Sequence, residues 1–117
     1  MVERIFKTAW FAKAAVKAHI QDAELCAVIR QVMLGQADDL GGGVFKRRIN
    51  KNMHRSIVLA KGKKCWVFAY LFAKKDRANI EDDELKAFRA LADLYASKTE
   101  PEIAKEIRLK ELLEICQ

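Results

Sequence analysis

Hydrophobic residues in the first third of the chain recur at helical spacing, after one short apolar segment. The segment Arg4-Ile5-Phe6 predicts an opening strand. Thr8 is a suitable N-cap for a helix that continues to about Ala18, and Asp22 is one for a second helix, which Gly35 can end. We therefore predict a strand followed by a helical hairpin. In the second helix, the stripe of residues that faces a core is Leu25, Val28, Ile29 and Val32.

The middle of the chain changes to the two-residue period of β-strands. Segment 44–49 alternates, so that Lys46 and Arg48 share one face of the predicted strand. Segment 56–59 is rich in β-formers, and segment 65–72 is apolar on both faces, as a central strand should be. A short loop with one glycine joins these last two segments. Three consecutive strands predict an antiparallel meander.

The last third returns to helical spacing. Acidic residues at 81–84 suit the start of a helix, because carboxylates interact favourably with its N-terminal dipole. Pro101 fits the first turn of a further short helix, and segment 109–116 fits either a helical turn or a last strand. The predicted order is β-α-α-β-β-β-α, an α+β fold with an antiparallel sheet packed against helices. The core stripe of the third helix is Leu85, Phe88, Leu91, Ala92 and Tyr95.

Length and hydropathy predict a single cytoplasmic domain. The 117 residues, 51% of them hydrophobic, are enough for one domain over residues 1–117. The longest apolar run, Cys65 to Ala73, is far shorter than the roughly 18 residues of a membrane span. Lysines 7, 13 and 17 interrupt the apolar stretch that a signal peptide would need. We expect no membrane partner.

The cysteines and histidines predict neither disulfide nor metal chemistry. Cys26, Cys65 and Cys116 are odd in number and widely spaced, which indicates no disulfide framework and no metal hook and suits the cytosol. His19 and His54 are too few and too scattered to form a metal site by themselves. We expect no metal and no other small-molecule cofactor.

Positive charge is concentrated in the predicted meander. The net charge is +6, but residues 1–43 are neutral and residues 78–117 carry −4, which leaves +10 on residues 44–77. A field this concentrated attracts polyanions, of which nucleic acid is the commonest. The alternative is a solvated basic surface that serves solubility.

Metal-independent cleavage of RNA needs the types of residue found here. The ribose 2′-hydroxyl must lose a proton, the phosphorane must be stabilised and the leaving oxygen must be protonated. Guanidinium groups match phosphate oxygens, as Arg48 and Arg55 can. Lysines crowded by like charges, and a histidine, are candidates for proton transfer. The candidate catalytic residues are Arg55, Lys74, Lys75, Lys46, Arg48 and His54, and the candidate RNA-binding residues are Arg47, Lys51 and Arg77.

Several of these features have simpler interpretations. Arg47 falls on the apolar face of its strand, and His54 fits a loop better than a catalytic position. Lysines 61, 63 and 64 fit a solvated hairpin tip, and glycines 41–43 fit a flexible turn better than a phosphate cradle. The acidic run 81–84 fits helix capping better than a cation site. The aromatic residues best explained as core are Trp66, Phe68, Tyr70 and Phe72.

The order of segments and several motifs resemble the RelE/ParE superfamily of bacterial toxins. The motifs cover residues 6–11, 39–49, 55–56 and 72–80, which together span most of the chain. The blocks LGGGVFKRRI and FAKKDRANI are specific in combination. Within the superfamily, the sequence is most similar to small HigB-like and phage-associated RelE-type toxins.

This resemblance implies a RelE-like fold and a toxin of a type II toxin–antitoxin module. Such a toxin cuts mRNA on the ribosome by 2′-hydroxyl attack without metal, and an antitoxin encoded beside it, in some modules of the helix-turn-helix type, neutralises it. By matching motifs, Lys46 and Arg48 correspond to the second-strand pair and Arg55 to the third-strand arginine. Lysines 74 and 75 and Arg77 correspond to the basic cluster after the fourth strand.

The sequence also departs from the superfamily pattern. Residues 50–54 replace a glycine-rich stretch that often precedes the third-strand arginine, and the catalytic tyrosine that some members carry near the C-terminus has no counterpart. ParE-type relatives share the fold but inhibit DNA gyrase, so the fold alone does not decide the activity. The alternatives are a ParE-like inhibitor and an inactive nucleic-acid-binding module.

Overall fold

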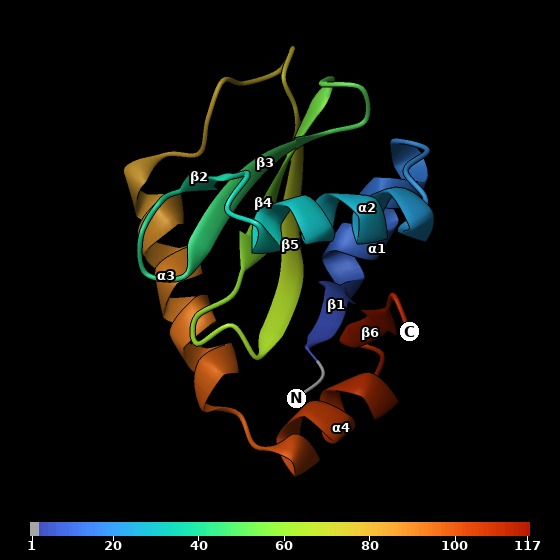
Figure 1. Ribbon diagram of the computed structural model, residues 1–117, viewed down its shortest axis with the longest axis vertical. Coiled ribbons are helices and arrows are strands. Elements are labelled where there is room, and N and C mark those ends of the chain that lie inside the picture. Colours follow the sequence, from blue (N-terminus) through green and yellow to red (C-terminus); the bar gives the residue numbers. More distant parts are fainter. Residues whose placement is uncertain (1–2) are drawn as a thin grey trace.

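The computed structural model describes residues 3–117 and contains four helices and a six-stranded sheet (Figure 1). None of the helices in this range is long and apolar enough to cross a lipid bilayer. In chain order the elements are β1 (Arg4–Thr8), α1 (Ala9–Lys17), α2 (Asp22–Met33), β2 (Asp38–Asp39), β3 (Val44–Ile49), β4 (His54–Leu59), β5 (Cys65–Ala73), α3 (Asp82–Ser97), α4 (Glu100–Arg108) and β6 (Leu112–Ile115).

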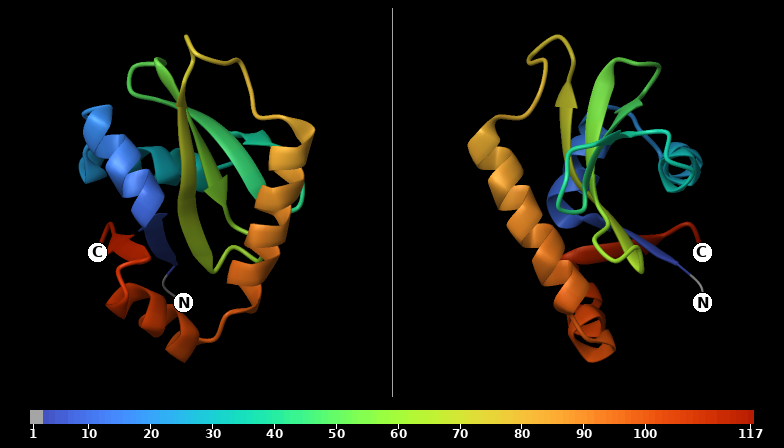
Figure 2. Two further views of the ribbon diagram at one scale, coloured as in Figure 1. Left: turned by 180° about the vertical axis from the view of Figure 1, so that it is seen from behind. Right: turned by 60° about the vertical axis from the view of Figure 1, so that its left-hand side comes forward.

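The sheet lies between two layers of helices. Its strand order is β2-β3-β4-β5-β1-β6, in which β1 and β5 are parallel and every other pair is antiparallel. Helices α1 and α2 cover one face and α3 covers the other, as the right panel of Figure 2 shows. We call these the α1/α2 face and the α3 face. The predicted α+β class and the antiparallel meander β3-β4-β5 are confirmed.

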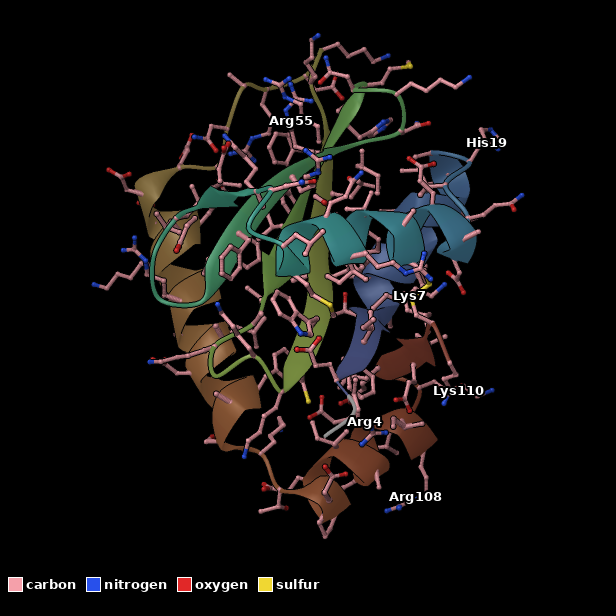
Figure 3. All side chains as sticks on the ribbon, viewed as in Figure 1. Arg4, Lys7, His19, Arg55, Arg108 and Lys110 are labelled. Atoms are coloured by element: carbon pink, nitrogen blue, oxygen red, sulfur yellow. A yellow bond between two sulfur atoms is a disulfide. The ribbon has the colours of Figure 1, made fainter. Side chains whose placement is uncertain are left out.

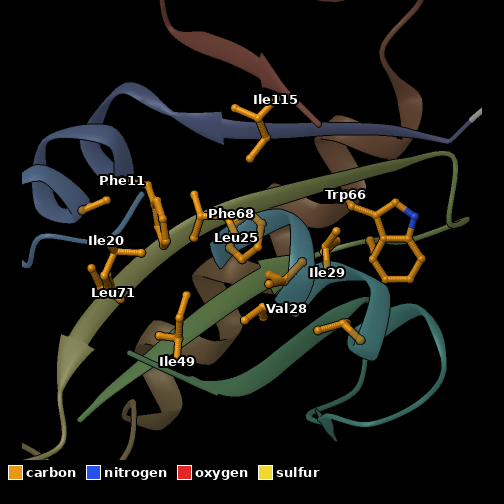
Figure 4. Close-up of a cluster of buried hydrophobic side chains, with 14 residues drawn as sticks. Phe11, Ile20, Leu25, Val28, Ile29, Ile49, Trp66, Phe68, Leu71 and Ile115 are labelled. Carbon is orange, nitrogen blue, oxygen red and sulfur yellow. The ribbon is translucent and has the colours of Figure 1, made fainter. Parts of the chain in front are cut away.

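Each face has its own hydrophobic core. On the α1/α2 face, the predicted stripe of α2 is buried against side chains such as Phe11 and Phe68 (Figure 4). On the α3 face, Phe6, Ile57 and Val67 pack against Ala92 and the rest of the predicted α3 stripe. Burying such apolar side chains contributes about 1.5–3 kcal/mol each. The sheet is therefore held from both sides, and its β3–β5 end is positioned by both cores.

A bulge in the β4–β5 pairing changes which way the aromatic side chains of β5 point. The register shifts between Ile57 and Val58, which leaves Ala69 without a cross-strand partner. Trp66 and Phe68 consequently pack on the α1/α2 face, whereas Tyr70 and Phe72 pack on the α3 face. Phe68 is fully buried, but Tyr70 is only partly so. All four aromatic residues pack in the two cores as predicted, Tyr70 as a partly buried member of the α3-face core.

The helix ends follow the sequence closely. The Thr8 hydroxyl accepts a hydrogen bond from the Phe11 N–H, as predicted for an N-cap. The N-cap position of the second helix is Gln21, one residue before the predicted Asp22, and the Gln21 side chain makes no capping hydrogen bond. Glu81 and Glu84 form a capping box at α3, which confirms the capping interpretation of the acidic run. Pro101 lies in the first turn of α4, and the ambiguous C-terminal segment contains strand β6.

A disulfide joins Cys26 of α2 to Cys116, so the expectation of no disulfide is wrong. The two residues are 90 positions apart, a separation that gave no signal in the sequence. They meet because β6 pairs with β1 at the edge of the sheet and returns the C-terminus to the α1/α2 side. The cysteine count consequently gives no support to a cytosolic location, since disulfides persist in oxidising surroundings. Cys65 remains a free thiol, and burial raises its pKa.

The glycine turn before β3 is ordered and sterically tight. Gly43 has φ +84°, and a Cβ there would lie 2.6 Å from the Cβ of Lys61 and 2.8 Å from its backbone. The Gly43 carbonyl also accepts a hydrogen bond from the Ala60 N–H at 2.8 Å. The turn interpretation is therefore confirmed, and its role is to start β3 in register with β4.

Gly43→Ala is expected to lower the free energy of unfolding by about 2–4 kcal/mol, because it adds a clash with backbone to left-handed strain. Gly62→Ala is the matched control, since Gly62 has φ +78° and nothing within 4 Å of an added Cβ. It should cost only about 1–2 kcal/mol. Urea denaturation of both variants measures the difference. Equal losses would show that the close contact with Lys61 contributes nothing.

Candidate functional site

Three predicted residues lie together on the α3 face, at the end of the sheet farthest from the glycine turn. Arg48 of β3 and Arg55 of β4 are direct cross-strand partners, and Lys46 lies two residues before Arg48 on the same face. Figure 3 shows Arg55 where the β3–β4 turn and the segment after β5 come together. These residues border an open depression of about 410 Å³, together with residues 36–38, Arg47 and Ala78. We call this depression the arginine site.

The arginines of this site have no negative partner in the part of the chain that the structure describes. The Nη1 of Arg55 donates hydrogen bonds to the carbonyls of Asn52 and His54, each at 3.1 Å. Across residues 3–117, neither Arg48 nor Arg55 forms an ion pair. Like charges directly opposite each other destabilise a sheet. Such a pair is suited to bind an anion that bridges both guanidinium groups.

Lys46 is the partly neutralised member of the arginine site. Its Nζ lies 3.8 Å from a carboxylate oxygen of Asp38, the residue opposite it in β2. The Asp38 side chain is largely exposed. The lysine is therefore held over the site by a weak, solvated ion pair, which an incoming anion can replace.

Arg77 extends the same face beyond β4. Its guanidinium lies 5.5 Å from the ring centre of Phe72, which is the cross-strand partner of Arg55. It also forms two hydrogen bonds with the Glu84 carboxylate and one, at 3.4 Å, with the Tyr70 hydroxyl. The Arg77 guanidinium and the Glu81 N–H hold the pKa of Glu84 below its usual value, and the carboxylate raises the pKa of Arg77. Arg77 is thus a cation fixed in place by an acidic helix start.

The remaining predicted groups gather around a second hollow. A cavity of about 520 Å³ is bordered by Lys51, His54, Lys74 and Lys75, together with Lys17 and His19. We call it the lysine site. Its β3–β4 side is a turn in which residues 50–52 all have positive φ. The Nδ1 of His54 lies 3.2 Å from the side-chain nitrogen Nδ2 of Asn50. His54 is the first residue of β4, so it is not in the loop that the sequence suggested.

Arg47 borders the arginine site, but its guanidinium is directed to α2. It donates a hydrogen bond to Gln31 of α2 and its Nε is buried without a partner. The prediction that Arg47 falls on the apolar face is therefore confirmed by the contact with α2. The predicted site residues thus divide into the arginine site, with Arg77 beside it, and the lysine site.

The sequence was compared with known protein families and with curated proteins. The family described as "RelE toxin of RelE / RelB toxin-antitoxin system" matches residues 3–115. The chain belongs to the RelE toxin family. It is therefore a toxin of a type II toxin–antitoxin system, and the family implies a cognate antitoxin partner. No curated protein matched the sequence.

Two aromatic residues of this RelE-family toxin belong to the same end of the molecule and were not predicted there. Trp10 of α1 is 51% exposed and stacks on Tyr70, with ring centres 4.9 Å apart. The sequence signal for Tyr70 was concealed by the bulge, because alternation assigns it to the same face as Phe68. Trp10 carried a weaker signal: it falls outside the Phe11, Ala14, Ala15 and Ala18 stripe of its helix.

The other tyrosine of the toxin is part of the α3 core. Tyr95 packs in the hydrophobic cluster of the α3 face, and burial raises its pKa to about 12. Its hydroxyl is therefore protonated at neutral pH. Its placement agrees with the position on the core stripe that the sequence predicted.

Proposed function

We propose that this toxin is an endoribonuclease that cleaves mRNA on the ribosome, with the arginine site holding the scissile phosphate. The observation that carries the proposal is the cross-strand pair Arg48 and Arg55, two unneutralised guanidinium groups on an open face. Such a pair costs stability in the free protein, and a phosphate that accepts hydrogen bonds from both removes that cost.

The reaction is attack within the RNA strand. The 2′-hydroxyl loses its proton, its oxygen bonds to phosphorus and the bond from phosphorus to the 5′-oxygen breaks. The 5′-oxygen takes up a proton, which leaves a 2′,3′-cyclic phosphate and a 5′-hydroxyl. Arg48, Arg55 and Lys46 stabilise the charge that grows on the phosphorane, and this electrostatic term is usually the largest in catalysis. The proposal calls on no metal or cofactor.

We assign proton transfer at the scissile phosphate to Lys46, because a general acid or base must lie within hydrogen-bond reach of the reacting oxygens and Lys46 borders the arginine site. The sequence offered His54, Lys74 and Lys75 as catalytic candidates, but they border the separate lysine site, so the proposal has them bind the nucleotides that flank the scissile phosphate. The sequence predicts RNA binding by Arg47, Lys51 and Arg77. We propose this role for Lys51 and Arg77. We do not propose RNA binding for Arg47, because its guanidinium is hydrogen-bonded to Gln31 of α2.

The partners follow from the same proposal. We propose that the substrate is mRNA on the ribosome, that the toxin acts in the cytoplasm as one domain over residues 1–117, and that it belongs with the HigB-like toxins. The LGGGVFKRRI and FAKKDRANI blocks support the last point. The antitoxin, encoded beside the toxin and of the helix-turn-helix type found in some modules, is proposed to lay an acidic segment over the basic end of the sheet.

Mapping of transcript 5′ ends after induction of the toxin in growing cells tests the activity. We expect new 5′-hydroxyl ends inside translated regions, and their loss when translation is blocked before induction. Intact transcripts together with a DNA-damage response would replace the proposal with a ParE-like inhibitor of gyrase. Intact transcripts without such a response, with salt-sensitive RNA binding, would indicate an inactive nucleic-acid-binding module.

A further inference from the structure

An exposed tryptophan is stacked on a fixed tyrosine beside the lysine site. Trp10 lies in the first turn of α1, and its ring packs on Tyr70 with an interplanar angle of 28°. Half of the Trp10 side chain nevertheless faces solvent. The stacked pair therefore presents an open aromatic surface on one side.

Contacts on the α3 side fix the tyrosine of this pair. The Tyr70 ring lies 5.8 Å from that of Phe88 and 5.9 Å from that of Phe72, and its hydroxyl is hydrogen-bonded to Arg77. Tyr70 therefore provides a fixed ring on which one face of the Trp10 ring stacks. The Thr8 cap fixes the first helical turn from which Trp10 projects. The pair is preorganised, so a ligand that stacks on it has little side-chain entropy to overcome.

The groove around this pair is basic. It has a volume of about 560 Å³ and runs between α1 and the second half of β5. Lys13 and Lys17 follow Trp10 at i+3 and i+7, so the three side chains share one face of α1. Arg77 contributes a further cation, and Asp76 is the single carboxylate among its lining residues. Aromatic rings flanked by lysines are the combination that binds single-stranded nucleic acid.

The groove and the lysine site are neighbours. Lys17, Ala18, His54 and Ala73 border both hollows. A strand of RNA that lies in the groove consequently continues past His54, towards the lysine site. In the left panel of Figure 2, α1 lies along the upper part of β5, where β1 no longer pairs with it.

We propose that Trp10 and Tyr70 form a stacking platform for an unpaired RNA base, and that Lys13 and Lys17 contact the adjacent phosphates. The inference rests on the proposed function for the identity of the RNA, because it places this base next to the nucleotides being cleaved. The platform reads a base by stacking, so it accepts any base and strengthens binding without defining a sequence.

Binding of 2′-O-methyl hexa-adenylate, followed by tryptophan fluorescence and by anisotropy of a labelled strand, tests the platform. This strand cannot be cleaved by 2′-hydroxyl attack. Trp66 is 2% exposed, so quenching by the strand reports on Trp10. Trp10→Ala is expected to weaken binding about tenfold, whereas Trp10→Phe, which keeps a ring, should remain within about threefold of the wild type. Thermal unfolding of both variants checks that they fold.

An abasic hexamer of the same charge is the control strand. Wild type and Trp10→Ala should bind it equally, because only the phosphates remain. Equal affinity of both proteins for hexa-adenylate would overturn the inference, as would an equal loss for the abasic strand. Weakened neutralisation by antitoxin with unchanged RNA binding would also overturn it, in favour of a protein-binding groove. The assay needs no cleavage, so a toxin that fails to cut mRNA but passes this test refutes the proposed function alone.

Discussion

Arg55→Ala is expected to abolish growth arrest and to lower the rate of mRNA cleavage on ribosomes by about 10²–10³-fold, the usual effect of removing one donor to a developing oxyanion. The reason is geometric, because Arg55 lies between two other cations on the α3 face. Its cross-strand partner in β3 is Arg48. Its partner in β5 is Phe72, and the Arg77 guanidinium lies over the Phe72 ring. Arg55→Lys keeps the charge but loses the planar guanidinium group. Its cleavage rate should therefore lie between that of the wild type and that of Arg55→Ala.

A matched variant separates this site from general loss of charge. Lys64→Ala removes one positive charge from the exposed loop between β4 and β5, away from both sites, and is expected to remain fully toxic. The stability of Arg55→Ala distinguishes loss of catalysis from loss of the fold. Removal of Arg55 relieves its repulsion from Arg48, so Arg55→Ala should unfold at a urea concentration no lower than the wild type does. Full toxicity of Arg55→Ala would show that the scissile phosphate binds elsewhere.

Reduction of the Cys26–Cys116 disulfide is expected to lower the free energy of unfolding by roughly 3–5 kcal/mol. The bond closes a loop across 90 positions, and the entropy it removes from the unfolded chain grows with the length of the loop. Strand β6 would keep its hydrogen bonds to β1 and the paired hydrogen bonds between Arg4 and Glu114, at 2.9 and 2.8 Å. The fold should therefore persist in the reduced protein with lower stability.

Urea denaturation of the oxidised protein, with and without dithiothreitol, measures this contribution. Cys116→Ser should match the reduced wild type and show no further response to reductant. Cys65→Ser is the control, because Cys65 is the free thiol, and this variant should keep the full response. If the oxidised and reduced proteins were equally stable, the Cys26–Cys116 disulfide would contribute nothing to the free energy of unfolding.

The local order of the fold was predictable because its signals are short in range. The stripe of α2 and the alternation of β3 are set by neighbours in sequence, and both proved to face the cores that they predicted. The N-cap Thr8 and the acidic start of α3 are likewise read from three or four residues. Strand β2, which has two residues, and the C-terminal β6 were not resolved by sequence, since each depends on a partner strand.

The candidate site was predictable in part. The sequence put Lys46 and Arg48 on one face, and the register then added Arg55 to them. It grouped Lys74 and Lys75 with these residues, but the structure places them around a separate hollow with Lys51 and His54. Adjacent residues of a strand point to opposite faces, so His54 and Arg55 cannot share a site surface in the way that their neighbouring numbers suggest.

By itself, the sequence determined the α+β class, the amphipathic stripes of the helices and the concentration of charge on the meander, because periodicity and composition are properties of neighbouring residues. Only the tertiary structure decided the Cys26–Cys116 bond and the pairing of Arg48 with Arg55, which depend on strand register. It also decided the stacking of Trp10 on Tyr70. A single bulge in β5 turns that tyrosine to the other face, and one extra residue in a strand leaves no mark on the sequence.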